Sequence, residues 1–127
     1  MSDIREEVKK AIGAHGLWKA RLKSAITSGK VDTDPANASK DTLCDFGKWI
    51  YSLKVPYTSS PTYNEIKKLH GQFHQTVGKA LGFIQAGQVK SAEQLMSPAG
   101  EYTLISQKLV DTLMRWSKEN ESTHASL

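Results

Sequence analysis

Residues 61–85, PTYNEIKKLHGQFHQTVGKALGFIQ, carry the clearest helical pattern of the chain. Apolar side chains recur here at three- and four-residue spacing, which places them on one face of an amphipathic helix. Ser60 and the proline after it form a typical helix start, and Gly87 is a suitable end. His70 and His74 fall within the apolar face, one turn apart, so both imidazoles are expected to point into the interior.

Similar spacing predicts the other helices. Residues 4–28 form an amphipathic helix, residues 29–38 are rich in turn formers and predict a loop, and a short helix is expected from about 39 to 53. The last helix begins near residue 89 and is interrupted by a Ser-Pro pair at positions 97–98. Long helices joined by short loops predict an all-α fold: an antiparallel four-helix bundle with a short second helix and an interrupted last helix.

The chain is expected to form a single domain over residues 1–118. Residues 119–127 have no apolar periodicity, and we expect them to form a disordered tail. His124 lies in that tail and is expected to have no role in a site.

Composition narrows the function classes. The 127 residues are 39% hydrophobic and 24% charged with a net charge of +4, which is ordinary for a globular protein. No apolar run is long enough to predict membrane insertion, and the dispersed basic residues carry no nucleic-acid signature. The start of the chain has no apolar signal core, and a single cysteine suits a reducing compartment. The cytoplasm is therefore the expected location.

Four side chains form a candidate metal site: His15, Cys44, His70 and His74. Any one of them alone has a simpler explanation, as a hydrogen-bonded core histidine or as a small apolar cysteine. Three histidines and the only cysteine, however, fall on inward faces of three predicted helices. Burying three imidazoles without partners would cost about 1–3 kcal/mol each. A shared ion would satisfy them together, and zinc accepts mixed nitrogen and sulfur ligands in a tetrahedron.

The same four residues argue against an enzyme. A catalytic zinc keeps one position open for water, whereas four protein ligands close the shell. Zinc proteases carry a glutamate directly after the first histidine of the His-x-x-x-His pair, and Gly71 stands there instead. A zinc enzyme would require one of the four ligands to dissociate and admit water.

Three motifs, in order, closely resemble the chemoreceptor zinc-binding (CZB) domain of bacteria: HGLWKARL from His15, CDFGKWI from Cys44 and HGQFH from His70. The resemblance covers roughly residues 4–118. It implies a helical bundle with zinc held by three histidines and one cysteine, roles that carry over to the four residues above. It also implies a cytoplasmic regulatory module of chemoreceptors and diguanylate cyclases, often a homodimer. No signalling domain follows in this chain, so a free-standing protein and a domain cut from a longer one are both open.

The expected function is thus a zinc-binding sensory module that responds to zinc availability or to oxidants such as hypochlorous acid through Cys44. The alternative is a structural zinc that staples the bundle and senses nothing.

Around the site, Gly47 predicts a close approach of another helix or of the metal surroundings. Asp41 and Asp45 are candidate acceptors for an imidazole N–H. Trp18 and Trp49 are expected to be packing residues.

Overall fold

The computed structural model describes residues 4–53 and 57–125 of the chain. In the part of the chain that it describes, all regular structure is helical, which confirms the all-α bundle. In chain order the elements are α1 (Ile4–Ser28), α2 (Pro35–Ala38), the 3-10 turn η1 (Asp41–Leu43), α3 (Asp45–Ser52), the 3-10 turn η2 (Tyr57–Ser59), α4 (Pro61–Gln85), α5 (Val89–Leu95) and α6 (Glu101–Ala125).

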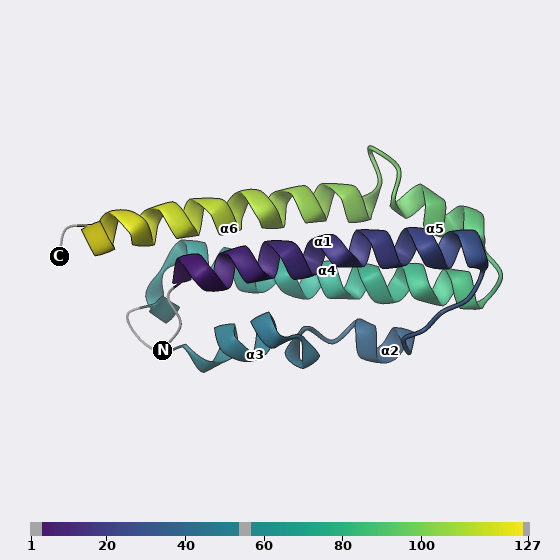
Figure 1. Cartoon of the computed structure of the whole chain (residues 1–127), viewed down its shortest axis with the longest axis horizontal. Helices are drawn as coiled ribbons and strands as arrows, with labels where there is room; N and C mark the ends of the chain where they lie inside the picture. The colour runs from purple at the N-terminus through teal and green to yellow at the C-terminus, as the bar shows by residue number, and fades with distance from the viewer. Residues whose placement is uncertain (1–3, 54–56, 126–127) are drawn as a thin grey trace.

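Successive arms of the bundle run in alternating directions (Figure 1). Helix α1 runs one way, the α2–η1–α3 segment returns, α4 repeats the direction of α1, and α6 returns again. The long helix α6 packs against both α4 and α1, and α2 packs on α4. The antiparallel topology is therefore as predicted, with the α2–η1–α3 segment as the second arm.

Helix α4 follows the prediction from its first residue to its last. The Ser60 side chain accepts a hydrogen bond from the backbone N–H of Tyr63, and Pro61 occupies the first turn. Such a cap satisfies one of the backbone N–H groups that a helix start leaves free. After the helix, Gly87 has a φ of +79°, a left-handed conformation that glycine adopts without steric strain.

The second arm differs from the single helix predicted over residues 39–53. A short helix, α2, already begins at Pro35 within the predicted loop, because the Asp34 side chain accepts from Ala36 N–H and proline starts the helix. The chain then passes through η1 and an extended Cys44 (φ −79°, ψ 141°) before α3 begins. Cys44 is therefore the cap residue before a helix and not a residue on a helical face.

The last arm is interrupted as predicted, between α5 and α6. Helix α6 continues to Ala125, whereas the lack of apolar spacing predicted a disordered tail from residue 119. The residues after Trp116 contain neither glycine nor proline, so nothing in the local sequence ends the helix there. The boundaries of the domain itself stay a prediction.

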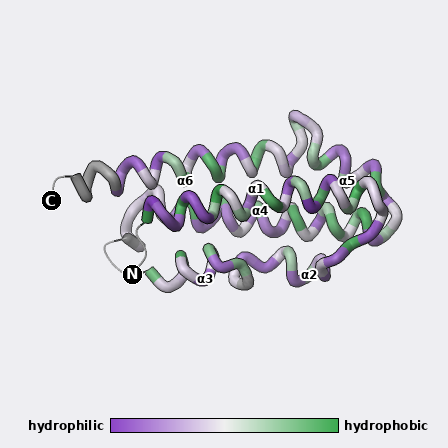
Figure 2. The backbone as a smooth tube through the Cα atoms, viewed as in Figure 1, coloured by the Kyte–Doolittle hydropathy of each residue, from purple (hydrophilic) through white to green (hydrophobic). Residues whose placement is uncertain are grey.

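The core lies between the long helices and is closed on one side by α3. Apolar and polar residues alternate along each long helix, as amphipathic packing requires (Figure 2). The largest fully buried apolar side chains of the core are Trp116, Phe73, Leu22, Ile50, Ile66, Leu81, Leu109 and Leu113. Among the described residues, no helix combines the length and apolar character that crossing a bilayer demands.

Candidate metal centre

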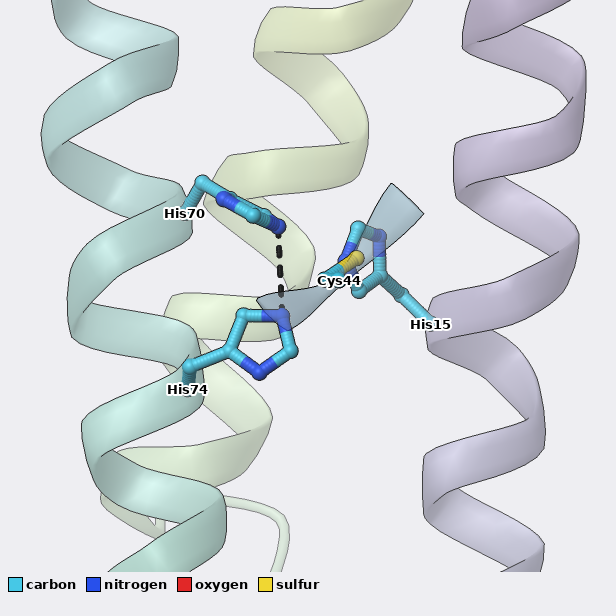
Figure 3. A group of neighbouring side chains, drawn as sticks. All are labelled: His15, Cys44, His70 and His74. Atoms are coloured by element: carbon cyan, nitrogen blue, oxygen red, sulfur yellow. Dashed lines mark hydrogen bonds between the residues drawn. The ribbon is translucent and has the colours of Figure 1, made fainter. Parts of the chain in front are cut away.

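The four predicted residues meet inside the bundle, although they come from three parts of the chain. His15 extends from α1, His70 and His74 extend from adjacent turns of α4, and Cys44 enters from the η1–α3 junction (Figure 3). The histidines are 3%, 0% and 3% exposed, respectively, while Cys44 is half-buried. One potential donor atom from each residue lies within 4.8 Å of the other three.

The separations are close to those of a tetrahedral zinc shell. Zinc–nitrogen bonds of about 2.0–2.1 Å place two bound nitrogens about 3.3–3.4 Å apart, and a nitrogen and a sulfur about 3.6 Å apart. The Nε2 atoms of His70 and His74 are 3.2 Å apart, and Cys44 Sγ lies 4.0 Å from His15 Nε2. The histidine pair is thus already at ligand spacing, and the thiol stands slightly further out.

The outer nitrogen of His74 fixes which nitrogen faces the cluster. His74 Nδ1 lies 3.1 Å from the carbonyl oxygen of Ala38, which can only accept a hydrogen bond. The proton of the neutral ring therefore sits on Nδ1, and Nε2 presents its lone pair toward His70. This is the arrangement that a metal-binding imidazole needs.

Burial keeps the three imidazoles neutral. Removal from water, with repulsion from His74 as the second cause, lowers the pKa of His15 to about 4 and that of His70 to about 2. Burial also lowers the pKa of His74, against an opposing hydrogen bond to Ala38. Neutral imidazole is the form that binds metal, so no proton has to leave the three histidines at neutral pH, whereas the Cys44 thiol must lose its proton to bind as thiolate.

The buried polar atoms provide a test of fit. His70 Nδ1 is fully buried and has no hydrogen-bond partner among the described residues. Orphaned buried polar atoms are rare in native proteins. The nitrogens that face the cluster are instead the Nε2 atoms, and together with the Cys44 sulfur they form a donor set that fits a bound cation.

Comparison with known families agrees with this geometry. The model of the family described as "Chemoreceptor zinc-binding domain" matches residues 15–81, which include all four cluster residues and more than half of the chain. The chain belongs to this family. No curated protein and no solved structure matched the chain.

Zinc is accordingly the metal of this chemoreceptor zinc-binding domain, and its three histidines and cysteine are positioned for such an ion. The assignment of these particular residues as the ligands stays a prediction that the geometry supports. His124, which was expected to have no role, lies outside the residues whose side chains the structure describes.

Aromatic rings enclose the cluster on its inner side. The ring of Phe73 lies 4.8 Å from that of His15, and the ring of Phe46 lies 5.2 Å from that of His70, centroid to centroid. These apolar walls exclude water and strengthen any charge interaction inside the site. The zinc-binding domain therefore holds its cluster in a dry environment on this side.

On the outer side, a pocket of about 280 Å³ opens onto the cluster. Its lining includes Cys44 and His74 together with Trp18 and the exposed Lys40. Cys44 is thus the cluster residue that combines partial exposure with a pocket to the surface. A small reagent can reach the sulfur from this direction without disturbing the core.

The residues predicted to surround the site have definite places. A Cβ at Gly47 would collide with the Asp41 carbonyl oxygen and lie 3.2 Å from His70 Cε1, which confirms the predicted close approach. Trp18 is half-buried beside the pocket, and Trp49 packs against Phe46, as expected of packing residues. 

The two candidate acids differ sharply. Asp45 is exposed, whereas Asp41 Oδ2 lies 3.9 Å from His70 Nδ1. The Ala38 carbonyl, which sets the His74 tautomer, was missed by sequence reasoning. A backbone group leaves no residue-type signal, although the Asp34-Pro35 helix start could have indicated structure at this point.

Proposed function

We propose that this chain is a cytoplasmic zinc-dependent sensory module in which His15, Cys44, His70 and His74 hold one ion. Bound zinc would join the three imidazoles and the thiolate into one closed shell. The observation that carries the sensory role is that the four donors lie on elements of different length and burial. Three sit on long, buried helices, and the fourth sits on a short segment beside a pocket.

The short segment is the part of the bundle that can respond. Helices α2 and α3 have 4 and 8 residues, and Cys44 lies between them in extended conformation. Isolated helices of this length are unstable in water, so their position depends on tertiary contacts. One of these contacts is the proposed bond between zinc and the Cys44 sulfur. Loss of that bond would leave the segment free to shift on α4.

Oxidation of Cys44 is one way to remove that contact. The thiolate gives two electrons to hypochlorous acid, forming a sulfur–oxygen bond while the oxygen–chlorine bond breaks: Cys–S⁻ + HOCl → Cys–SOH + Cl⁻. The resulting sulfenic acid is neutral and a weaker donor than the thiolate. Zinc scarcity would free the same sulfur without oxidation.

The expected assembly is a homodimer, whose changed packing would be read by a signalling protein or a fused output domain in chemotaxis or second-messenger control. The family description supports the link to chemoreceptors, and the homodimer and the second-messenger link rest on the resemblance of the sequence motifs.

A structural zinc that only staples the bundle is the competing function. The deep burial of the three histidines favours it, because a dry and closed site holds an ion tightly. The two functions differ in one respect: a staple keeps its zinc whatever happens at Cys44.

Zinc content before and after one equivalent of hypochlorous acid tests the proposal. We expect one zinc per chain in the native protein, lost or loosened on oxidation, and no oxidant response in Cys44→Ala. Met114→Leu is the matched control, because Met114 on α6 is 57% exposed and is also oxidisable, yet does not line the pocket that opens onto Cys44. Retention of zinc in the oxidised native protein would favour the staple, and absence of zinc would refute both functions.

A further inference from the structure

We propose that Asp41, held in place by Tyr51, is a positioning residue that fixes the tautomer of His70 for zinc binding. This inference rests on the proposed ligand set and extends it to two residues that bind no metal themselves. Both belong to the second arm of the bundle, on the opposite side of His70 from the cluster.

The need for such a residue comes from His70 itself. Its side chain is fully buried, and its Nδ1 has no hydrogen-bond partner among the described residues. The carboxylate oxygen Oδ2 of Asp41 lies 3.9 Å from this nitrogen, and the Asp41 side chain is only 18% exposed. This separation is about 0.7 Å longer than the upper end of the usual N–H···O range. Such contacts are often long before a ligand is bound.

The carboxylate is held from its other side. The Tyr51 hydroxyl donates a hydrogen bond of 2.7 Å to the same oxygen, Asp41 Oδ2. The backbone of Asp41 is also fixed, because its carbonyl oxygen occupies the space that a Cβ at Gly47 would need. At Gly71 a Cβ would lie 3.5 Å from Oδ2, so the absence of a longer side chain there leaves the path from Asp41 to His70 open.

Without Asp41, His70 has an attractive alternative. Its proton could move to Nε2 and donate to the Nε2 lone pair of His74, 3.2 Å away. That hydrogen bond would occupy both nitrogens that are meant for the metal. A carboxylate at Nδ1 keeps the proton there, frees the Nε2 lone pair and makes it a stronger donor.

The same stretch of chain therefore serves both histidines of α4. Ala38 accepts from Nδ1 of His74, Asp41 faces Nδ1 of His70, and Cys44 follows three residues later with the sulfur. A single segment thus orients two ligands and supplies a third.

Zinc affinity, measured by competition with a chromophoric chelator on the full chain, tests the proposal. Asp41→Ala should weaken binding about 10- to 100-fold, as loss of an outer partner typically does. Asp41→Asn keeps an acceptor without the charge, so its zinc affinity should lie between those of the native protein and Asp41→Ala. Tyr51→Phe removes one neutral hydrogen bond and should weaken binding about 2- to 10-fold. The matched control is Asp45→Asn, the loss of an exposed carboxylate nearby, which should leave the affinity unchanged.

Nitrogen NMR of His70 in the zinc-free protein gives a readout that a merely structural role would not move. The native protein should carry its proton on Nδ1, and Asp41→Asn, which preserves the shape of the side chain, should shift population to Nε2. Unchanged affinity and an unchanged tautomer in both Asp41 variants would overturn the inference. If the native protein bound no zinc, the proposed function would fail, while the tautomer would still decide the role of Asp41.

Discussion

The long helices and the short second arm contribute to one site in different ways. Helices α1 and α4 present three imidazoles from the fully packed core, next to side chains such as Phe73. The second arm brings a half-buried sulfur, on a segment where no regular element exceeds 8 residues. The position of the long helices is set by their own packing in the core. The position of the second arm is set by its contacts with those helices.

This difference suggests that the long helices and the second arm have different roles in the site. Helices α1 and α4 form a frame that keeps the three nitrogen donors in place when the sulfur moves. A segment that depends on few contacts can move without exposing the core. Changes made in one region and matched changes made in the other should therefore have effects of different kind and size.

The largest effect is expected from His70→Ala in the frame. Zinc binding of about 10–16 kcal/mol shared by four ligands corresponds to roughly 2.5–4 kcal/mol for each, or about 10²- to 10³-fold in affinity. Competition with a chelator measures it, and His124→Ala serves as the histidine control. Native affinity in His70→Ala would show that the frame does not hold the ion.

Acid should weaken the zinc-free frame next. Burial lowers the pKa of His15 from 6.5 to about 4, so the unfolded chain binds more protons between these values. Stability that is present above pH 6.5 is then lost as the pH falls, by about 2 kcal/mol between pH 7 and pH 5. His70 acts in the same direction, since its pKa is lowered to about 2. Urea unfolding after chelation would show this, and a stability that did not change with pH would contradict it.

Gly47→Ala tests how closely the second arm must approach the frame. The added Cβ would meet the Asp41 carbonyl and should destabilise the fold by about 1–3 kcal/mol through overpacking. The control is Gly16→Ala on α1, where a Cβ would have no described residue within 4 Å and the better helix former should stabilise by up to about 1 kcal/mol. Thermal unfolding should thus give opposite signs, and equal signs would mean that the approach is not tight.

The smallest effect concerns one hydrogen bond between the two regions. The buried Tyr63 hydroxyl on α4 donates to the Ile50 carbonyl on α3 at 2.8 Å. Tyr63→Phe should lower the free energy of unfolding by about 1 kcal/mol. Tyr102→Phe is the matched control, because the buried Tyr102 hydroxyl has no partner among the residues that the structure describes, and its removal should be neutral or stabilising. Denaturant unfolding of both variants decides the matter.

The frame could be predicted from sequence because its signals are local. Helix α4 has apolar spacing over its whole length, a capping Ser60 and a terminating Gly87, and all of these act within a few residues. The inward direction of His70 and His74 follows from the same spacing. The three histidines of the metal set could be proposed for the same reason, since residue type and helix face were readable one helix at a time, whereas Cys44 lies before α3 and not on a helical face.

The second arm could not be predicted to the same degree because its conformation depends on distant contacts. An apolar pattern over residues 39–53 favoured one helix, but the extended Cys44 and the tight Asp41–Gly47 approach break it. These features arise from packing of the second arm on α4, where the Ala38 carbonyl lies beside His74. The start of α2 was readable in Asp34-Pro35, the same signal that correctly located α4.

The one-turn spacing of His70 and His74 also bears on how the protein assembles. Two donors on one helix are brought together by local folding alone, so no long loop has to close before they meet. Cys44 is nearer to them along the chain than His15 is, and a shorter loop closes at a lower entropic cost. A nascent chain that meets zinc would therefore capture it first on α4, add the sulfur next and dock α1 last.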